Sequence, residues 1–395
     1  MPVRSDILSI QNEMIEWRRY LHAHPETAFQ EFGTSAFVIQ KLKSFGIEVK
    51  TGYARTGVVG TITNGRGPAI ALRADMDALS IMEENQFQHR STHEGTMHAC
   101  GHDGHTAMLL GAAKILASSR HFEGTIHFIF QPAEENEGGG QVMVDEGLFD
   151  EFPVEAVFGM HNWPGMPTGT FGIKSGPIMA SFDYFDITVN GKGCHAAMPQ
   201  LGKDSILIAS EIIAALHRIS SRRNPVDPAV LSVTKIHGGE TWNILPEHVR
   251  IGGTVRSFNQ LTQDEFEDKI RSTVRGICEA HGVTAGVEYI RKYPPTVNSV
   301  TETEIAKRAA EAVMSGSEVL QVEPSMGSED FAFMLKKTPG AYIWVGNGPA
   351  AGGCLLHSPH YDFNDEAMPV GTAYWVELAE NYGAHAATVK KSRPA

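Results

Sequence analysis

Two side chains that can coordinate a metal ion lie close together in the segment Met97–His105. Cys100 and His102 are two residues apart and can project to the same side of an extended segment. A thiolate beside an imidazole is a ligand pair that suits zinc and its first-row neighbours. The segment also leads into a helical pattern over His105–Ala117, so a polar helix cap is the other interpretation. The pattern therefore predicts either a metal-ligating pair or a local cap.

Two adjacent carboxylates, Glu134 and Glu135, follow the apolar run Thr125–Phe130, which predicts a strand. In extended backbone, adjacent side chains point in different directions. One carboxylate can therefore bind a metal ion while the other faces the substrate as a general base. Two solvated acids in a loop are the common alternative, but the position directly after a buried strand favours a functional pair.

Two histidines also follow predicted strands: His161 comes after Ala156–Met160, and His357 comes soon after Ala341–Val345. A lone histidine at a strand end is more often structural. Ligands of open α/β sheets, however, bind beyond the carboxyl ends of the strands, and four such places here offer only Cys, His and Glu. Five ligands exceed one tetrahedral site with an open position, so a dinuclear centre bridged by the Cys or the Glu is expected. The candidates are Cys100, His102, Glu135, His161 and His357.

The elements that must position these residues are apolar strands that alternate with helices. Further strands are predicted over Val58–Ile62 and Ala69–Leu72. Helical periodicity is found over Ile7–Leu21, Thr34–Phe45, His105–Ala117, Glu302–Met314 and Met368–Tyr382. Near-continuous hydrophobic strands between helices predict an α/β fold with a mainly parallel sheet sandwiched by helices.

The middle of the chain follows another pattern. Its order is strand, helix, strand, strand, helix, strand, which is that of an α+β ferredoxin-like domain. Thr262–Glu265 reads as a capping box at the start of the second helix. We therefore predict an inserted domain over 183–298 within a discontinuous domain made of 1–182 and 299–395.

The inserted domain offers three polar side chains near its predicted strands: His195, Asn243 and Arg256. Each is a donor that could bind a carboxylate or an oxyanion. Spacing alone does not separate this role from that of an ordinary surface residue.

Composition narrows the possible partners and location. The chain has 395 residues, enough for about two domains. It carries 33 basic and 46 acidic residues, a net charge of −13, which disfavours nucleic-acid and membrane partners. The first residues lack an apolar signal segment, and four cysteines do not form a disulfide framework in a chain of this length. A cytoplasmic location is expected.

Beyond these residue-level arguments, the chain resembles the M20 metallopeptidase clan. Within it, the closest likeness is to the amidohydrolase subfamily of N-acyl-amino-acid, hippurate and auxin-conjugate hydrolases. The motifs that carry the resemblance span nearly the whole chain in the family's order. They are Trp17–Glu26, Ala71–Leu79, Met97–His105, Gln131–Glu135, Gly159–His161, Gly193–Pro199, Ser328–Phe331, His357–Pro359 and Tyr361–Asn364.

The resemblance implies roles for the residues that match those motifs. Cys100, His102, Glu135, His161 and His357 match the family's metal ligands, which implies two divalent ions, with zinc, manganese, cobalt and nickel as candidates. Glu134 matches the general base. His195 matches a histidine that helps to polarise the scissile carbonyl, in some relatives across a dimer. Asn243 and Arg256 match positions that contact the carboxylate end of the substrate.

The resemblance also implies an architecture and an activity. The larger domain would be a zinc-exopeptidase-like catalytic domain, and the inserted one a lid through which the chain forms a homodimer or a tetramer. The expected reaction is metal-dependent hydrolysis of the amide bond of N-acetyl, N-benzoyl or similar amino acids. Peptidase members of the clan carry a metal-binding His two residues before an Asp, where this chain has Arg73 before Asp75, so a general peptidase is disfavoured.

Three alternatives remain at this point. A metallopeptidase would act on short dipeptides. A thiol hydrolase would use Cys100 as its nucleophile and would keep working after metal removal. A non-enzymatic metal carrier would bind ions but release no amine from an N-acyl amino acid.

Overall fold

The computed structural model describes residues 3–221, 223–224, 226–314, 319–349 and 355–392, so Cys354 lies outside the described residues. The chain divides into two compact units. Unit 1 consists of Met1–Ile178, Val297–Glu323 and Asp330–Ala395. Unit 2 consists of Met179–Thr296 with the short segment Pro324–Glu329.

Within the described residues, unit 1 is built on an eight-stranded sheet in the order β1-β2-β4-β3-β5-β16-β6-β15. Its strands are β1 (Glu48–Tyr53), β2 (Gly57–Asn64), β3 (Ala69–Asp75), β4 (Gly124–Gln131), β5 (Ala156–Trp163), β6 (Phe171–Ile173), β15 (Leu320–Gln321) and β16 (Gly340–Gly346). The central pairs β4/β3, β3/β5 and β5/β16 are parallel. The prediction of a mainly parallel sheet flanked by helices is confirmed.

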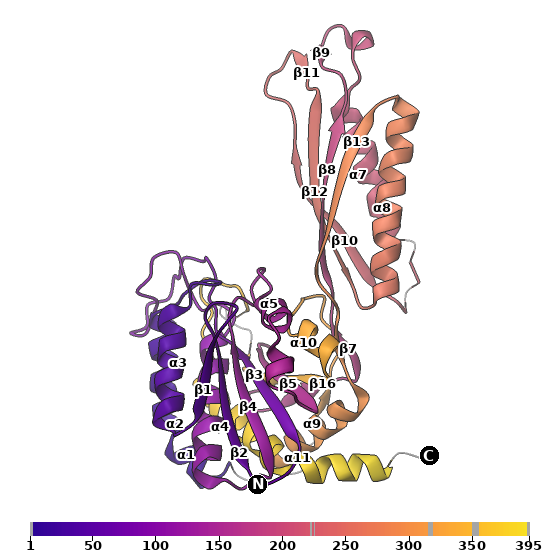
Figure 1. Cartoon of the computed structure of the whole chain (residues 1–395). Coiled ribbons are helices and arrows are strands. Elements are labelled where there is room, and N and C mark those ends of the chain that lie inside the picture. The colour runs from indigo at the N-terminus through magenta and orange to yellow at the C-terminus, as the bar shows by residue number, and fades with distance from the viewer. Residues whose placement is uncertain (1–2, 222, 225, 315–318, 350–354, 393–395) are drawn as a thin grey trace. The chain divides into compact units, whose positions relative to one another are not determined.

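Helices cover both faces of this sheet. They are α1 (Ser5–Ser9), α2 (Gln11–Ala23), α3 (Phe32–Ser44), α4 (His102–Ser119), α5 (Gly139–Asp145), α6 (Leu148–Glu151), α9 (Val300–Val313), α10 (Ala332–Lys337) and α11 (Met368–Ser392). Figure 1 shows α2, α3 and α4 beside one another, and α4 also packs against α11. The single helix predicted over Ile7–Leu21 is wrong, because the chain turns at Ile10 and forms α1 and α2 instead.

Along β3, apolar side chains face one side of the sheet and charged side chains face the other. Ile70, Leu72 and Ala74 lie in the main hydrophobic core. The intervening Arg73 and Asp75 are buried on the other side and pair with each other, because successive strand residues point to opposite faces. The sheet therefore keeps an ion pair in its interior at the carboxyl end of a central strand.

Unit 2 has an antiparallel sheet in the order β10-β12-β8-β13, covered by two helices. These elements are β8 (Phe182–Asn190), α7 (Ser205–Ser221), β10 (Ala229–His237), β12 (His248–Ser257), α8 (Gln260–His281) and β13 (Thr284–Tyr293). Shorter elements of unit 2 are β9 (Cys194–His195), η1 (Pro199–Leu201) and β11 (Ile244–Leu245). β7 (Gly176–Met179) and β14 (Thr296–Asn298) each include residues of both units, and η3 (Asp365–Ala367) belongs to unit 1. The core of unit 2 is formed by strand residues such as Ile187 and Ile251 against Ile212 of α7 and Phe266 of α8.

The start of α8 differs from the prediction. The helix begins at Gln260 and is capped by Asn259, whose side chain accepts a hydrogen bond from the Thr262 N–H at 2.8 Å. Thr262 is therefore inside the helix, and the predicted capping box is wrong. Asn is at least as good an N-cap as Thr, and it captures the free N–H groups first.

In the described part of the chain, no helix is both long enough and apolar enough to cross a membrane.

Candidate metal centre

The turn that carries Cys100 and His102 depends on the glycine between them. Gly101 has a φ of 92°, in the left-handed region, and His102 is the first residue of α4. A Cβ at this glycine would lie 2.4 Å from Asn162 Nδ2 and 2.7 Å from Tyr361 Oη. Because only glycine fits, the chain can turn here and place both side chains at the start of a buried helix.

All five predicted metal-binding residues come together in unit 1. Cys100 Sγ lies 3.3 Å from His161 Nε2, and Glu135 Oε1 lies 3.1 Å from His357 Nε2. Ligand atoms lie within 4.8 Å of one another in the groups Cys100/His102/His161, Cys100/Glu135/His357 and His102/Glu134/Glu135. Cys100, His102 and Glu135 each belong to two of these groups, and of the three only the thiolate and the carboxylate are side chains that can bridge two ions.

The histidines are oriented so that one ring nitrogen of each faces this cluster. His161 Nδ1 donates to the backbone oxygen of Asn162 at 2.7 Å, and His102 Nδ1 donates to the backbone oxygen of Asp77 at 2.9 Å. The His102 Nε2 atom is buried and has no hydrogen-bond partner among the described residues. A buried ring nitrogen without a partner, surrounded by Cys, His and Glu donors, fits a divalent metal ion.

A layer of side chains behind the cluster holds it in place. Asp75 Oδ1 accepts from His105 Nδ1 at 2.6 Å, and His105 Nε2 accepts from the backbone N–H of Asn162 at 2.9 Å. Both nitrogens of His105 are thus occupied, which explains why this histidine of the motif is not a ligand. Asp77 Oδ2 accepts from the backbone N–H of Glu135 at 2.9 Å and so fixes the Glu135 loop.

Burial and charge set the protonation of the candidate ligands. Burial and the carboxylates of Glu135 and Glu134 raise the pKa of the Cys100 thiol well above its usual range. Burial and the neighbouring His105 lower the pKa of His161, which keeps that ring neutral. Burial opposes the charge of His102, but Asp75 and Asp77 raise its pKa to about 10. The negative potential behind these shifts favours a bound cation, which would also displace the thiol proton.

Glu134 lies beside the cluster, three residues after the end of β4, and is only 7% exposed. The residue before it, Ala133, has a φ of 56° and donates its N–H to Glu31 Oε1 at 2.9 Å. This left-handed turn lets the two adjacent carboxylates both approach the ligand groups.

Unit 2 holds the predicted catalytic residue His195 and the predicted substrate-binding residues Asn243 and Arg256, at two different places. His195 on β9 pairs with Ile244 of β11, and the Ala196 N–H donates to the backbone oxygen of Asn243 at 2.9 Å. Both side chains are exposed. Arg256 lies near the far end of β12, stacked over the Phe182 ring at 4.1 Å and donating to Ser328 Oγ at 2.9 Å. Unit 2 therefore brings His195 and Asn243 together but not Arg256.

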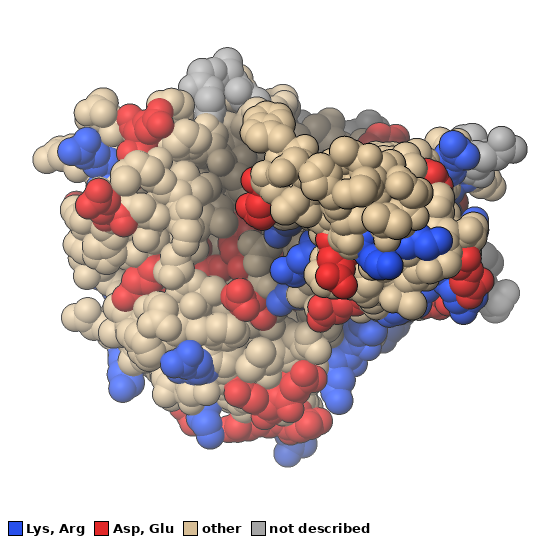
Figure 2. Space-filling model, turned by 90° about the horizontal axis from the view of Figure 1, so that it is seen from above, with Lys and Arg blue, Asp and Glu red and all other residues tan. Residues whose placement is uncertain are grey.

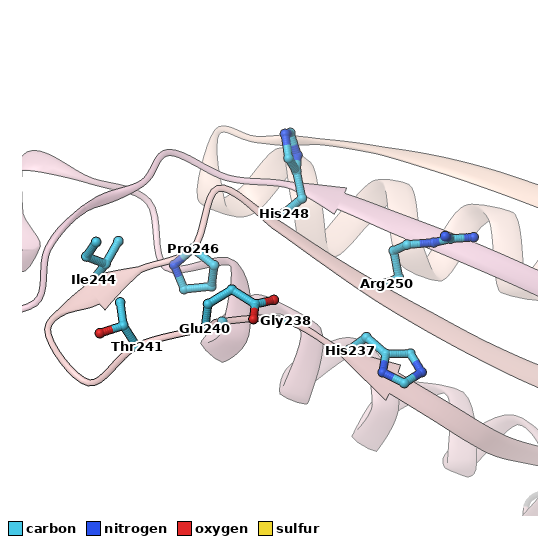
Figure 3. Close-up of a pocket in the computed structure, with 9 residues that line it drawn as sticks. His237, Gly238, Glu240, Thr241, Ile244, Pro246, His248 and Arg250 are labelled. Carbon is cyan, nitrogen blue, oxygen red and sulfur yellow. The ribbon is translucent and has the colours of Figure 1, made fainter.

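Unit 2 also has a surface pocket of about 450 Å³ lined by residues of β10, β11 and β12. Figure 3 shows that the side chains of His237, His248 and Arg250 point in different directions. The pocket thus lacks the convergent polar groups of a substrate site.

Residues 71–381 match the sequence profile described as Peptidase family M20/M25/M40. The chain belongs to this family. It is 38% identical to an N-acetyl-L-cysteine deacetylase of Bacillus subtilis over 95% of this chain and 89% of that protein. It is also 38% identical to a hippurate hydrolase of Campylobacter jejuni over 95% of this chain and 98% of that one. The predicted resemblance to the M20 clan is confirmed.

A solved M20 structure supports the fold at high coverage. The chain is 36% identical to a dinuclear metal-binding peptidase of Bacillus subtilis, with a TM-score of 0.84 over 95% of this chain and 99% of that one. The chain is therefore an M20 metalloenzyme, and the groups described above are its candidate ligands for divalent ions.

Several residues of this M20 site were not singled out from the sequence. They are Asp77, Asn162 and Glu31, together with His105, to which no role was assigned. Asp75 is the last residue of β3 and Asp77 comes two residues later, so the strand-end argument applied to the ligands could have found both, had the predicted strand not stopped at Leu72.

Proposed function

We propose that this M20 protein is a metal-dependent amidohydrolase that cleaves the amide bond of N-acyl amino acids to a carboxylic acid and a free amino acid. The observation that carries the proposal is the cluster of Cys, His and Glu ligand atoms with Glu134 beside it. The similar proteins named N-acetyl-L-cysteine deacetylase and hippurate hydrolase share this bond type in their substrates.

Two divalent ions are proposed as the cofactor, which Cys100, His102, Glu135, His161 and His357 would hold. When bound, such ions would polarise a carbonyl and lower the pKa of a bound water from its usual high value towards about 7. The thiolate and imidazole donors favour zinc, and manganese, cobalt and nickel are the ions to compare.

The protein's own groups move the protons in this proposal. Glu134 accepts a proton from the attacking water as its oxygen bonds to the amide carbon. The same carboxyl group then gives that proton to the amine nitrogen as the C–N bond breaks. The products are the carboxylic acid and the free amino acid, so atoms and charge balance.

The residues of unit 2 are proposed to bind the rest of the substrate. His195 would donate a hydrogen bond to the oxyanion, a contribution whose loss typically costs about 10²–10³ in kcat. Arg256 would bind the carboxylate of the amino acid. Because Asn243 lies apart from Arg256 within unit 2, it would reach that carboxylate only from a second copy of the chain. Unit 2 is also proposed as the surface of a homodimer.

A small-molecule substrate suits the charge of the surface. On the face shown in Figure 2, the described residues carry acidic and basic side chains in small separate groups. Together with the net charge of −13, this supports a partner other than a nucleic acid or an anionic membrane.

The test is to load the purified protein with each metal in turn and to supply N-acetyl, N-benzoyl and indole-acyl amino acids, with release of free amine as the readout. Activity that is lost on chelation and restored by metal supports the proposal. Activity that survives chelation would point to a Cys100 thiol hydrolase, and metal binding without amine release to a carrier. The similarity to a protein described as a peptidase makes dipeptide hydrolysis the second candidate, tested in the same assay.

A further inference from the structure

A second cavity in unit 1 opens next to the ligand cluster. Its volume is about 510 Å³, and its walls are formed by Thr27–Gln30, Arg55, Ala78–Ile81 and Glu135–Glu137. Pockets that hold small molecules typically have volumes of about 300–1,000 Å³. Because Glu135 lies in its wall and 3.1 Å from His357, a group in this cavity would sit beside the reacting bond.

The wall of this cavity has an apolar part. Leu79 and Ile81 pack against the main hydrophobic core and are only partly buried by it. Their remaining surface, with that of Phe29, lines the cavity. This part of the wall favours an apolar group over water, whereas the rest, with Arg55, Glu135 and Glu137, is polar or charged.

The backbone around the cavity is held in an uncommon conformation. Seven non-glycine residues of the described chain have a positive φ, and Phe29, Arg55 and Asn136 of the cavity wall are among them, at 59°, 70° and 67°. Two more, Ala54 and Ala133, adjoin wall segments. Left-handed backbone at non-glycine residues is costly, and it clusters where the surrounding structure must hold a binding site in shape.

The buried carboxylate of Glu31 accepts hydrogen bonds from three chain segments that form or lie next to the wall of this cavity. Glu31 Oε1 accepts from the backbone N–H groups of Phe29 at 3.0 Å and Ala133 at 2.9 Å. Glu31 Oε2 accepts from Thr56 Oγ1 at 2.7 Å. Because both oxygens of Glu31 accept hydrogen bonds from within the fold, Glu31 fixes the wall before any ligand arrives.

From these contacts we infer that this cavity, the acyl pocket, receives the acyl group of the substrate and selects acyl groups with an apolar body larger than acetyl, such as benzoyl. This inference rests on the proposed function. Phe29, Leu79 and Ile81 are the specificity-determining residues, and Glu31 is a positioning residue.

The experiment compares kcat/KM for N-benzoylglycine and N-acetylglycine in the metal-loaded wild type and two variants. Ile81→Ala removes part of the apolar wall, and Met82→Ala removes a neighbouring side chain that is 53% exposed and outside the wall. Wild type is expected to prefer the benzoyl substrate. Ile81→Ala should lower kcat/KM for it about tenfold, while the acetyl substrate changes less than about twofold. Met82→Ala should leave both values unchanged.

Binding provides a readout that does not depend on turnover. Benzoate, the product acid, should bind the metal-loaded wild type by calorimetry and bind Ile81→Ala about tenfold more weakly. Equal changes for both substrates, or no change in either measurement, would overturn the acyl pocket while leaving amide hydrolysis intact. Absence of amine release from every N-acyl amino acid by the wild type would instead reject the proposed function and the acyl pocket with it.

Discussion

The Nδ1–H of His102 donates to the backbone oxygen of Asp77 at 2.9 Å, and this contact decides which ring nitrogen faces the ligand cluster. The side chain of Asp77 extends the same arrangement, because its Oδ2 accepts from the backbone N–H of Glu135. Asp77, which follows β3, therefore orients both a histidine of α4 and a carboxylate in the loop after β4.

Asp77→Ala tests this orienting role. The backbone oxygen that fixes His102 remains, but the Glu135 N–H loses its acceptor. Metal affinity should fall about 10–100-fold, as is usual when a partner behind the ligands is removed. Competition titration with a chelator measures the change, and Asp145→Ala, at an exposed acid at the end of α5, is the control. Equal affinities in the wild type and Asp77→Ala would contradict the assignment.

Glu134→Gln separates proton transfer from metal binding. The amide keeps the size of the side chain but cannot accept the proton of the water. We expect unchanged metal content by elemental analysis and a loss of about 10²–10⁴ in kcat. Substantial residual turnover would reject Glu134 as the base, whereas loss of the metal would mean that it is a ligand.

The ligands could be predicted from sequence because each one follows a local signal. Short apolar runs mark β4, β5 and β16, and the candidate ligands Glu135, His161 and His357 come at or after the ends of these strands. Cys100 and His102 are instead marked by their spacing just before the helical pattern of α4. The mainly parallel sheet follows from the same runs, since such strands are buried on both faces.

The supporting contacts have no local signal. Asp75 and His105 are 30 positions apart, and His105 and Asn162 are 57 apart, so only the folded sheet brings them together. The left-handed turns at Ala133 and Phe29 are likewise held by Glu31, far away in sequence from the first of them. The capping prediction failed for a different reason. Asn259 and Thr262 are both residues that favour an N-cap, and Asn259, which comes first and is the stronger cap, is the one that caps α8.

Glu31→Ala is expected to destabilise the backbone segments that form the wall of the acyl pocket. The N–H groups of Phe29 and Ala133 and the Thr56 hydroxyl would lose their acceptor inside the fold. Each unsatisfied buried group costs about 1–3 kcal/mol, so the free energy of unfolding should drop by at least about 2 kcal/mol. Urea denaturation measures this, and Glu31→Gln, which retains one acceptor oxygen, should lose less. The control is Glu94→Ala, at an exposed glutamate. If the free energy of unfolding dropped no more in Glu31→Ala than in Glu94→Ala, the structural role of Glu31 would be contradicted.

His22 should make stability depend on pH. Burial alone would lower its pKa, but Asp103, with Oδ2 2.8 Å from Nδ1, raises it from 6.5 to about 9. The pair stabilises the folded protein by up to about 3 kcal/mol. This stabilisation is complete below the pKa of His22 in the unfolded chain and is lost as the pH rises through its pKa in the folded protein. The difference in unfolding free energy between wild type and His22→Gln should therefore shrink from about pH 6 to about pH 10. His121→Gln, at an exposed histidine, should show no such trend, and a constant difference for His22→Gln would reject the coupling.

Gly101→Ala should damage the metal centre through shape alone. The added methyl group meets Asn162 Nδ2 at 2.4 Å in a backbone whose φ is 92°, so both the contact and the conformation oppose it. Asn162 cannot yield easily, because its side chain donates to the backbone oxygen of Cys100 at 2.7 Å. We expect a loss of about 1–3 kcal/mol in unfolding free energy and weaker metal binding, since the turn places Cys100 and His102. Gly383→Ala is the control, because a Cβ there meets nothing within 4 Å and alanine in α11 should stabilise by about 0.5–1 kcal/mol. Normal metal affinity in Gly101→Ala would show that the turn can hold the ligands without glycine.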